Sequence, residues 1–216
     1  MFSMFVALKE LSQKVEACKL CPLWEGRTNV VFGAGDPRSD ILIIGEAPGK
    51  NEDEQGLPFV GKAGKDLDKL LGFAGLSRED VYIANVLKCR PPDNRDPKAE
   101  EIEFCAEYLR EQTRIIKPKL VVTLGNFATR FILKTDKGIT ELHGRPVNLG
   151  SFTVFPVYHP AAAIYDRKKR ADLEKDFKSL AKLYAKIKDP KDYENFDVAQ
   201  YYRDHLWSSS ADSTLA

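Results

Sequence analysis

The chain has 216 residues, of which 43% are hydrophobic and 30% are charged, and its formal net charge is +1. A chain of this length can bury one sizeable core, so one domain with a tail is expected. No apolar stretch reaches membrane-spanning length and no export signal is visible, which predicts a soluble, cytoplasmic protein. The near-neutral charge excludes a uniformly basic nucleic-acid binder, so any such contact must be a local patch.

Helical and strand-like patterns alternate along the chain. Apolar residues at helical spacing predict five helices, which begin near Phe5, Leu67, Lys98, Phe127 and Leu173. Four short apolar runs lie between them and predict strands that are buried on both faces, at 41–44, 81–84, 120–124 and 152–158. This alternating order specifies an α/β sandwich with a small parallel sheet.

Each predicted strand ends at a polar or glycine-containing element. The first runs into the turn at 45–49 and the second into Asn85. The third runs into Gly125 and Asn126, and the fourth into His159. Ligands of parallel sheets bind at the carboxyl ends of the strands. One such ending alone is an ordinary turn, but a glycine-rich turn, an amide and a histidine together predict a site for a small planar ligand.

Four cysteines form a second pattern. Cys18 and Cys21 form a CxxC knuckle, while Cys89 lies in a loop and Cys105 on the third helix. Disulfides are disfavoured without an export signal, and a redox CxxC leaves the second pair unexplained. Four thiolates suit tetrahedral zinc or a cubane iron–sulfur cluster, which spacing alone does not separate. Two independent pairs of core cysteines are the alternative.

Two glycine-containing segments mimic phosphate-binding loops. Residues 56–63 match Walker spacing up to the lysine, but Ala63 replaces the hydroxyl residue that binds magnesium. The turn at 45–49 lacks the third glycine of a dinucleotide fingerprint, and Glu46 would repel a pyrophosphate. The site is therefore expected to take a neutral ligand, or one approached by backbone donors.

In their order, these motifs resemble the family 4 uracil-DNA glycosylases, the iron–sulfur type found in thermophiles. The resemblance covers about residues 8–187, and it rests on GEAPG at 45–49, GLPFVG at 56–61, Asn85 ahead of CRPP at 89–92, and HPAA at 159–162. It implies a three-layer α/β/α sandwich around a four-stranded parallel sheet, within a glycosylase domain of residues 1–188. It also implies a [4Fe-4S] cluster on Cys18, Cys21, Cys89 and Cys105.

The implied activity is hydrolytic release of uracil from single- and double-stranded DNA by a monomer, which leaves an abasic site. Such an enzyme flips the base out and holds it by stacking and by its Watson–Crick edge. Phe59 is similar in position to the stacking aromatic of the family, and Asn85 can pair with N3–H and O4 of uracil. Backbone groups of Glu46, Ala47 and Pro48 are expected to line the same pocket.

Cleavage leaves negative charge on uracil, and His159 is the candidate donor to that anion. Its protonation state does not follow from the sequence. The better-known uracil glycosylases resemble this turn but carry an aspartate where this chain has Ala47, so the usual water-positioning acid is absent. Glu46, Glu52 and Asn94 are the substitutes, in falling order for catalysis. Glu52 is alternatively a group that crowds the 5-methyl of thymine.

Two basic segments lie near these motifs in the sequence. A basic run is usually a solvated face, but beside the site it predicts contacts with DNA phosphates. The candidates are Lys62, Lys65, Arg167, Lys168, Lys169 and Arg170.

Residues 189–216 form a C-terminal extension that is expected to dock on the core or to fold on a partner. Gln200, Leu206 and Trp207 loosely resemble a sliding-clamp-binding peptide, although Arg203 stands where that motif has an aliphatic residue. The alternative to an enzyme is a non-catalytic DNA-binding module with a metal cluster. An electron-transfer protein is disfavoured because that function would not use Asn85, Phe59 and His159.

Overall fold

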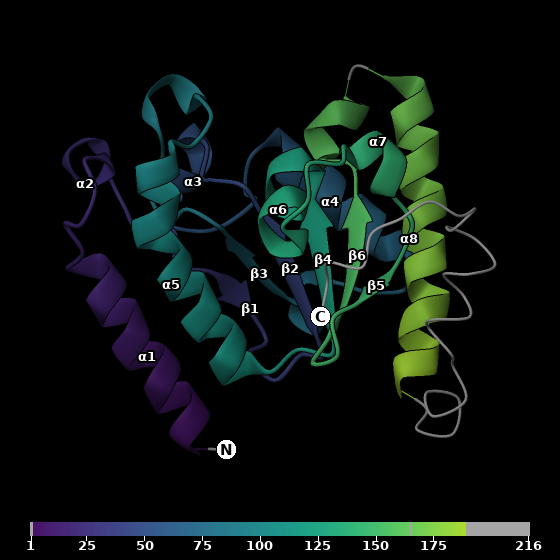
Figure 1. Ribbon diagram of the computed structural model, residues 1–216, viewed down its shortest axis with the longest axis horizontal. Coiled ribbons are helices and arrows are strands. Elements are labelled where there is room, and N and C mark those ends of the chain that lie inside the picture. The colour runs from purple at the N-terminus through teal and green to yellow at the C-terminus, as the bar shows by residue number, and fades with distance from the viewer. Residues whose placement is uncertain (1, 165, 189–216) are drawn as a thin grey trace.

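The computed structural model describes residues 2–164 and 166–188, and its centre is a sheet with strand order β1-β3-β2-β4-β6-β5 (Figure 1). The inner strands pair in parallel and are β3 (Tyr82–Asn85), β2 (Ile41–Gly45), β4 (Leu120–Leu124) and β6 (Thr153–Val157). The predicted four-stranded parallel sheet is confirmed. Short antiparallel edge strands extend it, namely β1 (Ala34–Gly35) and β5 (Val147–Asn148).

The inner strands are buried on both faces, as their unbroken apolar runs predict. In β2, Ile41 and Ile43 belong to one hydrophobic core, whereas Leu42 and Ile44 belong to a second. Successive side chains of a strand point to opposite faces, so a strand between two cores needs apolar residues at every position. The sheet therefore separates two cores, and each core needs its own layer of helices.

Helices cover both faces of the sheet. The core around Ile43 is closed by α4 (Lys62–Phe73) and α8 (Arg167–Lys188). The core around Leu42 is closed by α1 (Phe2–Glu16), α5 (Ala99–Ile116) and α6 (Gly125–Leu133). Figure 1 shows α1 and α5 side by side, with α8 at the opposite end of the sheet. The five predicted helices and the three-layer α/β/α sandwich are confirmed.

Short elements complete the described residues, and periodicity in the sequence does not reveal them. They are α2 (Leu23–Gly26), α3 (Lys50–Gln55), α7 (Ile139–Leu142), and the 3-10 turns η1 (Arg78–Asp80), η2 (Pro92–Asn94) and η3 (Pro160–Ala163). The most consequential is α3, which has no apolar residue. It ends at Gly56, whose φ of 70° is left-handed and returns the chain toward Phe59.

Across residues 2–164 and 166–188, no helix is long and apolar enough to cross a membrane. The predicted extension at 189–216 lies outside the described residues. The same holds for the clamp-binding interpretation of Gln200, Leu206 and Trp207, which stays a prediction.

Candidate active site

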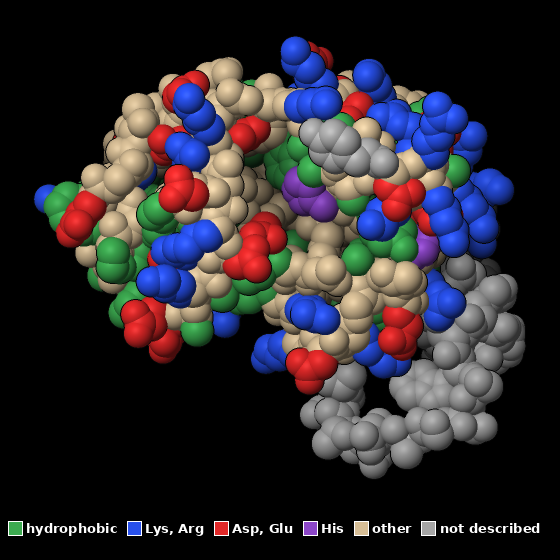
Figure 2. All heavy atoms as spheres, turned by 90° about the horizontal axis from the view of Figure 1, so that it is seen from above, with side chains coloured by type: hydrophobic (Ala, Val, Ile, Leu, Met, Phe, Trp, Pro, Cys, Tyr) green, Lys and Arg blue, Asp and Glu red, His purple; other side chains and the backbone are tan. Residues whose placement is uncertain are grey.

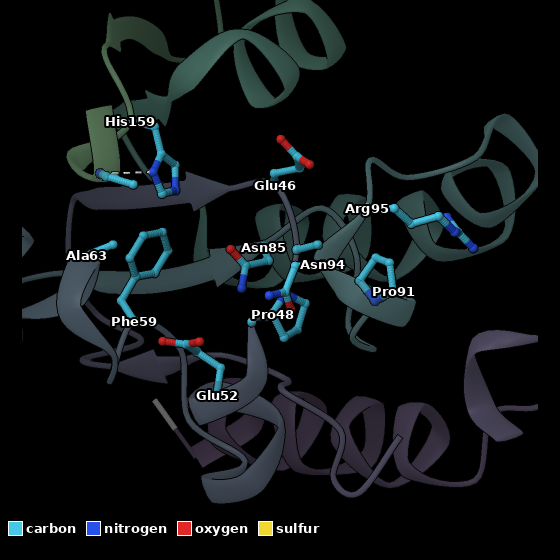
Figure 3. A pocket seen from close by; sticks show the side chains of 13 residues that line it. Glu46, Pro48, Glu52, Phe59, Ala63, Asn85, Pro91, Asn94, Arg95 and His159 are labelled. Atoms are coloured by element: carbon cyan, nitrogen blue, oxygen red, sulfur yellow. Dashed lines mark hydrogen bonds between the residues drawn. The ribbon is translucent and has the colours of Figure 1, made fainter. Parts of the chain in front are cut away.

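The carboxyl ends of β2, β3 and β6 open into one cavity of about 460 Å³, which we call the strand-end pocket (Figure 3). All residues predicted for base binding and catalysis line it: Glu46, Ala47, Pro48, Glu52, Phe59, Asn85, Asn94 and His159. From above, the surface is hollowed, and a histidine lies in the hollow beside hydrophobic side chains (Figure 2). The strand order explains this convergence, because parallel strands end at the same edge of the sheet.

Asn85 is the last residue of β3 and is 1% exposed. Its Oδ1 is the one buried side-chain polar atom without a hydrogen-bond partner among the described residues. A buried acceptor left unpaired typically costs about 1–3 kcal/mol. An atom of this kind in the wall of a pocket fits a ligand that supplies the missing donor.

Gly45 pairs with Asn85 in the sheet, and its lack of a side chain keeps the pocket open. A β-carbon on Gly45 would lie 2.3 Å from Asn85 Oδ1 and 2.6 Å from Phe59 Cζ. Both distances are far inside van der Waals contact. The first glycine of the 45–49 turn therefore makes room for the amide and the aromatic ring, and serves no phosphate.

Phe59 lies beside Asn85 in the pocket and next to His159 (Figure 3). The centroids of the Phe59 and His159 rings are 5.8 Å apart, and the ring planes are inclined by 32°. Phe59 is 6% exposed and has a φ of 53°, which is rare for a bulky side chain. Such strained residues concentrate at binding sites, where the surrounding structure must hold them.

His159 follows β6 and begins η3. Its Nδ1 accepts a hydrogen bond of 3.2 Å from the Ala161 N–H, so the proton of the neutral ring must be on Nε2. Burial by the surrounding protein lowers the pKa of His159 to about 4, and the nearby Glu52 carboxylate acts in the opposite direction without cancelling this shift. The ring is therefore neutral near pH 7, with an Nε2–H donor available to a ligand.

The two acidic residues of the pocket differ in their surroundings. Glu52 Oε1 accepts two hydrogen bonds, from Val60 N–H at 2.9 Å and from Gly61 N–H at 2.8 Å. Glu46 is half-buried, and its carboxyl group points away from Asn85 (Figure 3). Burial raises the pKa of Glu46, and repulsion from the Asp96 carboxylate raises it further. A raised pKa in a pocket makes Glu46 a candidate for proton transfer.

The third candidate for water activation, Asn94, lies at the rim in η2 and is exposed. Its Oδ1 accepts a hydrogen bond of 2.8 Å from Arg90 Nε. Asp93 and Asn94 both have a φ of 53°, so the rim turns through two consecutive left-handed residues. Asparagine and aspartate tolerate this conformation better than most residues.

Further residues line the strand-end pocket that sequence reasoning did not select: Gly49, Ala63, Pro91, Arg95 and Ala161. Arg95 is the most notable of them, because its guanidinium forms a bidentate ion pair with Glu101 at 2.5 and 3.0 Å. Its only signal in the sequence was its place shortly after the CRPP run. Its orientation toward Glu101 on α5 follows from the tertiary fold.

The four cysteines surround a second cavity, which we call the cysteine cavity. All four are free thiols, and they are Cys18, Cys21, Cys89 and Cys105. Arg27 Nη1 donates to Cys89 Sγ at 3.2 Å, and the Lys88 N–H donates to Cys105 Sγ at 3.2 Å. Burial raises the pKa of Cys89 and raises that of Cys105 to about 12. The thiols of Cys89 and Cys105 therefore keep their protons unless a bound cation displaces them.

Lys88 connects the two cavities and is completely buried. Its Nζ donates to the Asn85 carbonyl at 2.9 Å and to Gln112 Oε1 at 2.5 Å, while the side chain also lines the cysteine cavity. Gln112 in turn donates to the Phe32 carbonyl at 2.9 Å. A buried ammonium is costly unless hydrogen-bonded and compensated, and its hydrogen-bond partners here are neutral.

The predicted DNA-contacting residues stand outside the strand-end pocket, at the beginnings of α4 and α8. The two helices meet where Arg170 Nη2 contacts Asp66 Oδ1 at 3.4 Å. Lys169 forms an ion pair of 3.7 Å with Asp166. Figure 2 shows Lys and Arg side chains gathered beside the hollow, on the side where α8 lies in Figure 1. The fold thus brings the two basic segments to one side of the opening.

Comparison with known proteins agrees with this geometry. The profile of the "Uracil DNA glycosylase superfamily" matches residues 32–188. A type-4 uracil-DNA glycosylase of Sulfurisphaera tokodaii is 45% identical over 82% of this chain and 84% of its own length. Another, from Archaeoglobus fulgidus, is 42% identical over 83% of this chain and 94% of its own, and one from Thermotoga maritima is 45% identical over 73% and 83%. The chain therefore belongs to the uracil DNA glycosylase superfamily and, within it, to the type-4 uracil-DNA glycosylases.

Proposed function

We propose that this protein is a DNA repair glycosylase, which flips uracil out of DNA and hydrolyses its N-glycosidic bond to release free uracil and leave an abasic site. The observation that carries the proposal is the unpaired, buried Oδ1 of Asn85 in a pocket shared with Phe59 and His159. A base entering the pocket supplies the donor that this atom lacks.

Base recognition follows from the chemistry of Asn85 and Phe59. Asn85 Oδ1 accepts the N3–H of uracil, and the amide NH₂ donates to O4. Cytosine has an unprotonated N3 and an amino group at C4, so both contacts become mismatched. The Phe59 ring supplies a stacking surface beside the amide, and it closes the pocket against His159. Glu52 lies at the same wall and crowds a 5-methyl group, which supports rejection of thymine.

His159 supports the departure of uracil as an anion. Its neutral ring keeps a proton on Nε2, because Nδ1 already accepts from Ala161. A donor fixed in a desolvated pocket stabilises charge that develops in the transition state more than it stabilises the neutral substrate. Since His159 is neutral near pH 7, it acts by hydrogen bonding and does not donate a full proton from an imidazolium.

For the attacking water we assign Glu46 as the base. Burial and the Asp96 carboxylate raise its pKa, which makes the ionised form a stronger base. Glu52 is the second candidate and has one oxygen engaged by the 60–61 backbone. Asn94 is the third and has no basic group, so it can only orient a water. The order of these candidates, Glu46 before Glu52 before Asn94, is the one expected from the sequence.

The cysteine cavity supports the proposal that Cys18, Cys21, Cys89 and Cys105 hold a [4Fe-4S] cluster. The donor set fits such a group, because all four cysteines line one small, largely apolar cavity and two of them receive N–H hydrogen bonds at sulfur. When bound, the cluster supplies a cross-link between the end of α1 and the segment after β3. Its role is structural, since the cavity is separate from the strand-end pocket.

The substrate is uracil-containing DNA, single- or double-stranded, bound along the beginnings of α4 and α8 by the lysines and arginines predicted there. A monomer suffices, because one chain supplies all pocket residues. Residues 1–188 form the glycosylase domain in this proposal, and residues 189–216 form an extension that carries the sliding-clamp interpretation.

The decisive experiment measures base release from single-stranded and duplex oligonucleotides that carry uracil, hypoxanthine or a T:G mismatch. We expect free uracil and alkali-labile abasic sites from both uracil substrates, and no thymine from the mismatch. DNA binding without release of any base would instead identify a non-catalytic metal-cluster DNA-binding module.

A further inference from the structure

Phe59 adopts a backbone conformation that it does not prefer. Its φ of 53° is left-handed, and its side chain is large. The peptide around it is also crowded, because a β-carbon on Gly64 would lie 1.7 Å from the Phe59 carbonyl oxygen. A loop with this strain relaxes unless other groups hold it, and relaxation would carry the ring out of the pocket wall.

One guanidinium holds the carbonyl side of this loop. Arg78 of η1 donates from Nη1 to the Pro58 carbonyl at 3.1 Å and from Nη2 to the Phe59 carbonyl. Nη2 also reaches the Gly64 carbonyl, at 3.5 Å. The far edge of the guanidinium is fixed by Nε, which donates to Asp68 Oδ1 on α4. Only arginine offers several donors in a rigid plane that can serve neighbouring carbonyls at once.

A carboxylate holds the amide side of the same loop. Glu52 Oε1 receives the N–H groups of Val60 and Gly61, the two residues that follow Phe59. The loop is therefore held by a cation on its carbonyls and an anion on its amides. Arg78 does not line the strand-end pocket, so it has no direct contact with a base there.

We propose that Arg78 is a positioning residue for base recognition: its hydrogen bonds to the Pro58 and Phe59 carbonyls keep Phe59 left-handed, so that the ring forms the stacking wall of the strand-end pocket. The inference rests on the proposed function, because it assumes that Phe59 stacks on uracil. Arg78 would thus contribute to base recognition without touching the base or the reacting atoms.

The first test compares Arg78→Gln and Arg78→Lys with a matched control. Arg114→Gln is the control, because Arg114 is an exposed arginine paired with Glu107 and Glu111 on α5, away from the pocket. For Arg78→Gln we expect single-turnover uracil release to fall about tenfold and inhibition by free uracil to weaken by a similar factor. Arg78→Lys should lie between, and the control should stay within about twofold. Affinity for undamaged DNA should not change.

The second test separates positioning from plain stability by a double-mutant cycle. If Arg78 acts through the ring, Arg78→Gln should cause no further loss of uracil release in a Phe59→Ala background. Additive losses, or an unchanged rate in the single variant, would overturn the proposal. Where Arg78→Gln fails to fold, Arg78→Lys replaces it in the cycle.

A third measurement distinguishes failure of the inference from failure of the proposed function. Hydrogen exchange of the Val60 and Gly61 amides should accelerate in Arg78→Gln and stay unchanged in the control. If Phe59→Ala alone leaves uracil release unchanged, the stacking role in the proposed function is wrong, and the positioning role of Arg78 falls with it. If Phe59→Ala is impaired but amide exchange and release in Arg78→Gln are normal, only the inference is overturned.

Discussion

The strand-end pocket and the cysteine cavity lie close together, but they differ in size and in how far their polar atoms are already hydrogen-bonded. The first has a volume of about 460 Å³ and keeps an unpaired polar atom, Asn85 Oδ1. The second is narrow and lined by four cysteines, two of whose sulfur atoms already receive hydrogen bonds. A site with an unmet hydrogen bond suits a ligand that enters and leaves. A site whose ligand atoms come from distant segments of the chain suits a metal group that binds as the protein folds.

The largest expected effect tests the cysteine cavity. Cys105→Ser removes one of four proposed ligands on the buried side of α5. We expect loss of most bound iron and a midpoint of thermal unfolding lower by about 4–20 °C, in line with the roughly 2–5 kcal/mol lost with a covalent cross-link. Iron and sulfide should be near four each in protein prepared without oxygen, by analogy with the proposed cluster. Zinc as the only metal would contradict the cluster.

The next effect tests catalysis in the strand-end pocket. His159→Ala removes the Nε2–H donor and should lower the single-turnover rate of uracil release by roughly 10²–10³. Binding to DNA with an uncleavable uracil analogue should change much less, because the full charge on the base exists only along the reaction path. Equal losses of affinity and rate would show that His159 binds and does not catalyse.

A smaller effect is expected from Asn85→Asp. A carboxylate accepts only, so it loses the donor to uracil O4 and gains the ability to receive the cytosine amino group. A mismatched buried contact is worth about 1–3 kcal/mol, so uracil release should fall by at least about tenfold. Kinetics on uracil and cytosine oligonucleotides measure the change. Normal uracil kinetics in a folded variant would remove Asn85 from recognition.

The basic residues should affect binding more than chemistry. Changing Arg167, Lys168 and Lys169 together to Ala should weaken binding to all DNA and flatten the logarithmic salt dependence by up to about one unit per lost phosphate contact. The saturated rate of uracil release should remain close to that of the unchanged protein. A lowered saturated rate with an unchanged salt slope would place these residues in the pocket chemistry instead.

The smallest expected effect concerns pH: the rate of uracil release should not change with the protonation of His159 between about pH 5 and 8. The pKa of His159 is lowered to about 4, so the ring is mostly neutral above about pH 5 and becomes mostly protonated only below about pH 3. In Glu46→Gln, which removes the other perturbed acid, the residual single-turnover rate should be flat between about pH 5 and 8. An inflection near the ordinary histidine pKa of about 6.5 in that variant would contradict burial as the dominant influence.

Much of the fold could be predicted from the sequence, because the long elements carry strong periodicity. The edge strand β1 has two residues and α3 has only polar ones, so neither leaves an apolar pattern to read. The pocket residues were predictable for a related reason. Apart from Glu52 and Asn94, they stand at or just after the end of a readable strand or within a glycine-bounded motif, and parallel topology brings such ends together.

Other features depended on tertiary contacts that no local pattern encodes. The neutral state of His159 follows from burial, and the position of its proton follows from the Ala161 N–H; neither is visible in HPAA. The bonds from Arg78 to the Phe59 loop join residues 19 positions apart, through a 3-10 turn that has no periodic signal. Glu52 was expected to act on water or on thymine, and its two backbone contacts became apparent only in the folded loop.

Lys88 links the strand-end pocket to the cysteine cavity. Its ammonium holds the carbonyl of Asn85, the residue whose amide faces the pocket, and its side chain also forms part of the wall around the thiols. The backbone that carries the Asn85 amide is therefore held in place by a residue of the cysteine cavity.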